Sequence, residues 1–196
     1  MNKIVLMKKI EDELTNFKKS PLFKYRMENK FFPVIGEGSV DSKIMFIGEA
    51  PGKKEALTGR PFCGASGKLL DSLLESVGIK RADVYITNIV KDRPQDNRDP
   101  SSEEIKLYGP FLDRQIEIIQ PKIIATLGRF SFLYAMKHFG LEEKIEPIGQ
   151  AHGKSYETNF SYGKVKIISL YHPAVALYNG GMRETLKNDF KILKDL

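Results

Sequence analysis

The stretch KIMFIGEAPGKKEALTGRPFCGASGKLLDSLLESVGI, residues 43–79, decides the predicted fold, because a glycine-rich loop joins a strand to a helix there. Residues 43–50 form a short apolar run that ends near a glycine, which is typical of a buried strand. Residues 64–79 carry leucines at helical spacing, and Gly78 suits the end of that helix. The loop predicts a ligand site, in which Cys63 is interpreted as a small buried hydrophobe.

The rest of the chain alternates in the same way. We expect helices over 2–18, 129–140 and 182–196, and a further helix that begins after Ser101 or Ser102 and ends near Gln120. Strands are predicted over 82–90, 122–128 and 165–170, the last preceded by a short hairpin or strand, while 20–42 looks irregular. This order indicates an α/β protein: a three-layer α/β/α sandwich with a central, mostly parallel four-stranded sheet. Without a repeat or linker, residues 1–196 are predicted to form a single domain.

Composition narrows the functional class. The chain has 196 residues, of which 41% are hydrophobic and 29% charged, as in ordinary globular proteins. A membrane span and a signal peptide are not expected, because no run of eighteen apolar residues occurs and the amphipathic N-terminus carries charges throughout. One cysteine cannot form an internal disulfide or a metal site built from cysteines alone. We therefore expect an intracellular, cytoplasmic protein.

The charge of the chain is moderately basic, with a formal net value of +6. Such an excess suits a polyanionic partner such as nucleic acid. A lysine-rich solvated surface explains the same value equally well, so charge alone leaves both interpretations open.

Unusual polar residues follow three of the predicted strands: GEAPG at 48–52, TN at 87–88 and YHP at 171–173. Each has a plain structural explanation as a turn or a helix cap. Together they indicate a site, because ligands of open parallel sheets bind outside the carboxyl ends of the strands. The loop matches neither the phosphate-binding pattern of nucleotide hydrolases nor the dinucleotide fingerprint, so it must serve another ligand.

Four motifs carry a specific resemblance: GEAPG at 48–52, TGRPFCGASGKLLD at 58–71, YITNIVKDRP at 85–94 with NR at 97–98, and YHPA at 171–174. From about Ser20 to the C-terminal helix, the chain resembles uracil-DNA glycosylases of family 4. The resemblance implies a monofunctional enzyme of base excision repair. Such an enzyme flips deoxyuridine out of DNA, hydrolyses the N-glycosidic bond and leaves an abasic site.

The resemblance also implies roles at the site. Phe62 is expected to stack on the flipped base, and Asn88 to read the edge of uracil. His172 is expected to stabilise the uracil anion as the bond breaks. Either Glu55 or Glu49 is expected to position the attacking water or to organise the loop, and the sequence leaves the choice between them open. Gly48, Glu49 and Ala50 complete the predicted uracil pocket, with Ala50 at the place where family 1 relatives have an aspartate.

Further residues are expected to hold DNA. The loop at 173–183 resembles the segment that wedges into the duplex, and we expect Asn97 to support the pocket. The candidate wedge residues are Val175, Ala176, Leu177 and Tyr178, and Pro173 at the start of this loop is a further candidate DNA contact. The candidate DNA contacts elsewhere are Lys53, Lys54, Ser66, Gly67, Lys91, Arg93, Asn97, Arg98, His152, Lys154 and Arg183.

Family 4 members usually hold a four-iron four-sulfur cluster on four cysteines. The corresponding places here are Phe17, Ser20, Asp92 and Tyr108, and none is a cysteine. Because such a cluster needs thiolate ligands, we expect no cofactor. Aromatic and polar packing, with Phe17 against Tyr108, is expected to replace it.

Two alternatives to uracil excision stay open. One is a glycosylase of shifted specificity, for example for hypoxanthine, and the other is a DNA-binding relative that has lost catalysis. The retained Phe62, Asn88 and His172 speak against the second. The covalent variant of the superfamily is not expected, because the chain lacks the histidine insert after GEAPG. We expect a monomer associated with the nucleoid, bound to uracil-containing single- or double-stranded DNA, and the sequence reveals no partner such as a sliding clamp.

Overall fold

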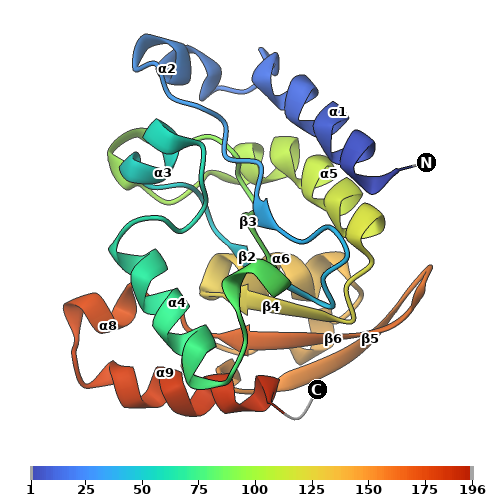
Figure 1. The fold of residues 1–196 in the computed structure, drawn as a ribbon, viewed down its shortest axis with the longest axis vertical. Coiled ribbons are helices and arrows are strands. Elements are labelled where there is room, and N and C mark those ends of the chain that lie inside the picture. Colours follow the sequence, from blue (N-terminus) through green and yellow to red (C-terminus); the bar gives the residue numbers. More distant parts are fainter. Residues whose placement is uncertain (1, 195–196) are drawn as a thin grey trace.

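The computed structural model describes residues 2–194 and contains a six-stranded sheet with the order β1-β3-β2-β4-β6-β5 (Figure 1). The four inner strands run parallel to one another, and the edge strands β1 and β5 are antiparallel to their neighbours. The strands are β1 (Glu37–Gly38), β2 (Ile44–Gly48), β3 (Tyr85–Asn88), β4 (Ile123–Leu127), β5 (Ser155–Phe160) and β6 (Gly163–Leu170).

Helices connect and cover these strands. They are α1 (Lys3–Thr15), α2 (Phe23–Glu28), α3 (Lys53–Thr58), α4 (Ala65–Ser76), α5 (Ser102–Ile119), α6 (Arg129–His138), α7 (Ile148–Ala151), α8 (Val175–Tyr178) and α9 (Met182–Phe190). Short 3₁₀ turns lie at Arg81–Asp83, Gln95–Asn97, Glu142–Lys144 and Lys191–Leu193. No helix within residues 2–194 is long and apolar enough to cross a membrane.

The sheet separates two hydrophobic layers, because successive side chains of a strand point to opposite faces. On β2, Met45 and Ile47 belong to the layer formed with α1, α5 and α6. Phe46, between them, belongs to the layer formed with α4 and α9. In Figure 1, α1 and α5 lie above the sheet and α4 and α9 below it. The three-layer α/β/α prediction is therefore confirmed.

The strand count needs a correction, since the predicted four parallel strands form the centre of a six-stranded sheet. The sequence anticipated β5 only as a short hairpin or strand, and the two-residue β1 was missed because it lies in a stretch rich in glycine. Helix α3 occupies part of the predicted loop, and α2 part of the irregular stretch. The predicted C-terminal helix ends at Phe190, and residues 195–196 lie outside the described part of the chain.

The cap of α5 agrees with the sequence. The Ser101 hydroxyl accepts from the Glu104 backbone N–H, and the Glu104 carboxylate accepts from the backbone N–H of Ser101. This reciprocal capping box fixes the start of α5. It matters for the site because α5 supplies the side chains that pack behind the end of β3.

Candidate active site

A cavity of about 170 Å³ opens at the carboxyl ends of the parallel strands. Strand β2 has β3 on one side and β4 on the other, so the chain reverses its direction of progress across the sheet here. Ligands of open α/β sheets bind at such a switch point. The predicted convergence of strand ends is present, since the lining residues are Ala50, Gly52, Glu55, Phe62, Ser66, Asn88 and His172.

The carboxamide of Asn88 is the most informative group in this cavity. Asn88 is 2% exposed, and its Oδ1 has no hydrogen-bond partner among the described residues. Such a buried polar atom is costly unless a ligand or water satisfies it. Gly48 lies beside Asn88 in the sheet, and a Cβ on Gly48 would lie 2.4 Å from Oδ1 and 2.7 Å from the Phe62 ring. Glycine at 48 therefore keeps room for the amide and the ring.

Phe62 forms one wall of the cavity in a strained conformation. Its φ of +46° is in the left-handed region, which costs a non-glycine residue about 1–3 kcal/mol. Gly67, in the first turn of α4, packs so closely that a Cβ there would lie 1.7 Å from the Phe62 carbonyl oxygen. The Phe62 ring is buried and lies with its centroid 5.6 Å from that of the His172 ring. An aromatic face and an imidazole edge thus border the same small space.

His172 carries its proton on a defined nitrogen. Its Nδ1 accepts a hydrogen bond of 3.1 Å from the Ala174 backbone N–H, so in the neutral ring the proton resides on Nε2. Burial lowers the pKa of His172 to about 4, although the Glu55 carboxylate acts in the opposite direction. At neutral pH the ring is therefore an uncharged donor through Nε2. Gly128 at the end of β4 permits its position, because a Cβ there would lie 3.1 Å from the His172 Cβ.

The two candidate acids have different surroundings. Glu55 lines the cavity, and its Oε1 accepts from the backbone N–H groups of Cys63 and Gly64 at 3.0 and 2.9 Å. It thereby fixes the loop that carries Phe62. Glu49 is not part of the cavity lining. Burial raises the pKa of Glu49 to about 7, with a further increase from Asp99 and an opposing effect from Arg129.

Two predicted phosphate contacts are wrong, because they point inward. Lys91 is completely buried, with its ammonium group enclosed by polar atoms of β3 and α5. Arg93 is 8% exposed, and it donates to the Tyr25 hydroxyl at 2.7 Å and to the Asn97 Oδ1 at 2.8 Å. Asn97 thus supports Arg93 and does not line the cavity. The apolar run before Lys91 was the available signal that its position is interior.

Other predicted contacts have protein partners. Arg98 forms an ion pair with Glu104, and Lys154 forms one with Glu146. The His152 ring stacks on Tyr171 with centroids 4.4 Å apart. The Nδ1 of His152 lies 2.9 Å from a carboxylate oxygen of Asp189 on α9.

The prediction that Cys63 is a buried small hydrophobe needs a correction, since its side chain is only half-buried.

The loop after His172 presents a subset of the predicted wedge residues. Tyr178 is 91% exposed and Leu177 is 43% exposed, both on α8. Ala176 is buried and Val175 packs against the core, so neither is an exposed wedge, and the candidate DNA contact Pro173 is buried as well. The basic candidates Arg183, Lys53 and Lys54 are exposed. Helices α3, α4 and α8 lie on the left side of Figure 1, with α4 and α8 below α3.

The four places at which the family 4 resemblance implies cysteines lie together. The Tyr108 hydroxyl is 2.7 Å from the Ser20 Oγ and 2.6 Å from the Asp92 Oδ2, and the Phe17 ring packs edge-on against Tyr108. The Arg26 guanidinium pairs with the Asp92 carboxylate at 3.0 Å, with both side chains at most 3% exposed. We name Arg26, Asp92, Tyr108 and Ser20 the buried polar network. These neutral and anionic oxygens do not fit the thiolate ligands of an iron–sulfur cluster.

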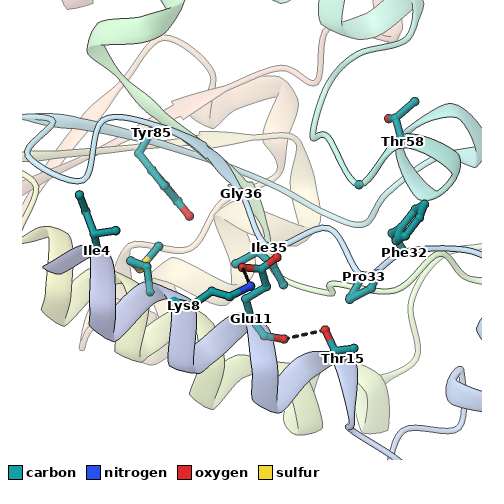
Figure 2. A pocket seen from close by; sticks show the side chains of 12 residues that line it. Ile4, Lys8, Glu11, Thr15, Phe32, Pro33, Ile35, Gly36, Thr58 and Tyr85 are labelled. Carbon is teal, nitrogen blue, oxygen red and sulfur yellow. Dashed lines mark hydrogen bonds and ion pairs between the residues drawn. The ribbon is translucent and has the colours of Figure 1, made fainter.

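A second cavity, of about 520 Å³, lies between α1 and residues 32–36. Figure 2 shows Ile4, Phe32, Ile35 and Tyr85 around it, with Lys8 and Glu11 paired on α1. None of the unpartnered buried polar atoms in residues 2–194 belongs to its lining. This larger cavity thus lacks the convergent polar groups that distinguish the cavity at Asn88.

Comparison with known proteins gives the family of the chain. A profile described as the uracil DNA glycosylase superfamily matches residues 35–196. Three curated relatives carry the name type-4 uracil-DNA glycosylase. The protein of Sulfurisphaera tokodaii is 44% identical over 97% of this chain and 84% of its own length. The protein of Saccharolobus solfataricus is 46% identical over 95% and 84%, and that of Archaeoglobus fulgidus 47% over 83% and 81%.

Proposed function

The chain belongs to the uracil DNA glycosylase superfamily, and we infer that it is a uracil-DNA glycosylase, which hydrolyses the N-glycosidic bond of deoxyuridine in DNA. One observation at the site supports this inference most directly: the Oδ1 of Asn88, in the cavity, has no hydrogen-bond partner in the described part of the chain. A cavity of about 170 Å³ is small compared with ordinary ligand pockets and suits one pyrimidine ring.

We propose that Asn88 reads the base. Its Oδ1 accepts from the ring N–H of uracil, and its amide N–H₂ donates to the neighbouring carbonyl. Cytosine has the opposite pattern at these two atoms and would leave the buried amide unpaired. Each unpaired group costs about 1–3 kcal/mol, which favours uracil. Phe62 provides the face on which the flipped ring stacks.

We propose that the tautomer of His172, with its proton on Nε2, assists the departure of the base. As the glycosidic bond breaks, negative charge develops on the uracil ring and its carbonyl oxygens. The Nε2–H of His172 donates to the carbonyl next to the glycosidic nitrogen and stabilises this charge. The uncharged ring keeps its proton during the reaction, so the base leaves as an anion.

We propose that Glu55 positions the attacking water, since its carboxylate lines the cavity and its Oε1 is fixed by two backbone donors. We therefore predict that Glu55→Gln slows single-turnover uracil release by about 100-fold, a typical loss for a positioned acid or base. Glu49→Gln, the matched control directly after β2, should slow it by less than about 10-fold. The measurement is alkali cleavage of a labelled uracil oligonucleotide under enzyme excess. A larger loss in the Glu49 variant would reverse the assignment.

A pH effect on stability follows from Glu49. Its raised pKa, about 7, means that the folded protein retains a proton that the unfolded chain releases near the ordinary value. Folding is therefore favoured by this group below the ordinary pKa, and the contribution is lost as the pH rises toward 7. We predict that Glu49→Gln removes this part of the decrease in the free energy of unfolding with rising pH. Urea unfolding of both proteins from about pH 4.5 to 7.5 measures it, and parallel curves would contradict the prediction.

We propose that the chain functions without an iron–sulfur cluster. One cysteine in the whole sequence is not enough for four thiolate ligands, and the buried polar network stands at the corresponding places. Metal analysis of the purified protein tests this proposal, with no iron above background expected. Stoichiometric iron together with absorbance at about 400 nm would overturn it.

DNA is proposed to approach along α3 and α8. Tyr178 and Leu177 are exposed side chains on α8, which follows His172 in the chain, and they suit insertion into the gap left by the flipped base. Lys53, Lys54 and Arg183 are the exposed cations that we assign to phosphates, with the Ser66 hydroxyl at the cavity edge. We propose that residues 1–196 act as one domain and as a monomer on DNA.

One assay tests the function and its alternatives. Oligonucleotides with a single uracil opposite guanine, opposite adenine or in single-stranded form are incubated with the protein and then with alkali. Strand cleavage at uracil is expected. Cleavage at hypoxanthine alone would instead support shifted specificity. Binding without cleavage of any of these substrates would support an inactive DNA-binding relative.

A further inference from the structure

The ammonium group of Lys91 lies inside the protein behind Asn88, and the chemistry proposed above makes no use of it. Lys91 is completely buried. Its Nζ donates to the Asn88 carbonyl oxygen at 2.6 Å, the Gln115 Oε1 at 2.5 Å and the Thr87 Oγ1 at 2.7 Å. It therefore joins the end of β3 to α5 directly beneath the residue that reads the base.

The hydrogen-bond partners of Lys91 favour its ammonium form. The Thr87 hydroxyl gives its own proton to the Ile35 carbonyl oxygen at 2.7 Å. The Gln115 amide nitrogen donates to the same carbonyl at 2.9 Å, which turns the amide oxygen toward Lys91. All three partners of Lys91 therefore need a proton from it, and only an ammonium has three. Burial lowers the pKa of Lys91 well below its usual range, and the Asp113 carboxylate acts in the opposite direction.

This arrangement has a consequence for Asn88. The Lys91 Nζ donates to the backbone carbonyl of Asn88, whereas the Asn88 Oδ1 has no partner within residues 2–194. Because Thr87, Gln115 and the Asn88 main chain use all three protons, none is left for that side-chain oxygen. The same contact fixes the Asn88 carbonyl to Gln115 on α5. The carboxamide is thus held in place and left unsatisfied for a ligand.

We propose that Lys91 is a positioning residue for the base-reading amide of Asn88. Its buried ammonium anchors the end of β3 to α5 and keeps the Asn88 side chain free toward the cavity. This inference rests on the proposed function, since the consequence of misplacing Asn88 is measured as uracil release.

The test is a double-mutant cycle between Lys91→Met and Asn88→Ala. Methionine has a similar length but no donors, so Asn88 loses its anchor. Lys91→Met is expected to slow single-turnover uracil release by about 10- to 100-fold, the usual effect of misplacing a reactive contact. In the Asn88→Ala background the same change should have less than about a 3-fold effect, because the group that it positions is gone. A general loss of folded protein would lower the rate equally in both backgrounds.

A matched control and a second variant separate this role from folding. Thr126→Val removes another buried hydrogen bond, 3.1 Å to the Ile168 carbonyl, away from Asn88, and should leave the rate unchanged. Gln115→Leu removes the α5 end of the anchor and repeats the test if Lys91→Met does not fold. Near-wild-type rates, or losses that multiply with Asn88→Ala, would overturn the proposal. So would failure of both variants to fold, since the contacts would then serve folding itself.

Failure of the proposed function gives a different result. If the wild-type protein releases no uracil from any substrate, uracil excision is wrong before any variant is measured. If the wild type is active and the cycle shows no coupling, only the role of Lys91 is wrong.

Discussion

His172→Ala is expected to slow the single-turnover release of uracil by about 100- to 1,000-fold, the usual cost of removing one oxyanion donor. The reason is the loss of the Nε2–H that stabilises the departing uracil anion. Binding to uracil-containing DNA should change little, because its affinity depends mainly on phosphate contacts made by other residues. Rates come from alkali cleavage under enzyme excess, and affinities from fluorescence anisotropy.

The conservative control is His172→Gln, whose amide N–H₂ is a neutral donor of similar reach. It should retain more activity than the alanine variant if hydrogen bonding to the leaving group is what matters. Nitrogen chemical shifts of His172 provide a direct check, since the lowered pKa of about 4 predicts a neutral ring with its proton on Nε2 from about pH 6 to 8. A charged ring in that range, or full activity in His172→Ala, would contradict the mechanism.

The position of the site was predictable from the sequence because strand ends are local features. A glycine-terminated apolar run and the motifs after it identify the ends of β2, β3 and β6, and parallel pairing brings them to one edge. The sequence alone therefore predicted that Asn88, Phe62 and His172 share one candidate site. The choice between Glu55 and Glu49 was not predictable, because it depends on which carboxylate lines the cavity.

The polar segment after β3 shows where the sequence misleads. Lys91, Asp92 and Arg93 look like an exposed basic loop, since polarity usually indicates exposure. Their partners Gln115, Arg26 and Tyr25 are 24 to 68 residues away in the chain, so no local pattern reveals the pairings. All three side chains turn inward and attach the end of β3 to α2 and α5. Short elements such as α3 and β1 were missed for a related reason, since tertiary packing defines them more than their own propensity.

Asp92→Ala is expected to lower the free energy of unfolding by about 3–5 kcal/mol, the usual effect of removing one partner from a buried ion pair. The Arg26 guanidinium would stay buried with no carboxylate beside it, since its side chain is 3% exposed. The Tyr108 hydroxyl would lose an acceptor as well. Guanidinium chloride unfolding of wild type and variant, followed by circular dichroism, measures the change. A loss below about 1 kcal/mol would contradict the view that the buried polar network carries the structural role of a cluster.

Two companion variants show which interaction carries the effect. Tyr108→Phe keeps the ring packing against Phe17 and removes only the hydroxyl, so it should cost about 1–3 kcal/mol. Arg26→Met combined with Asp92→Leu removes both charges and should cost less than Asp92→Ala alone, because no unpaired ion remains. The double variant still loses the bonds from Arg26 to the Leu14 and Thr15 carbonyls at the end of α1. Its remaining deficit therefore combines the loss of this attachment of α1 with the loss of the Tyr108 acceptor, and Tyr108→Phe measures the second contribution by itself.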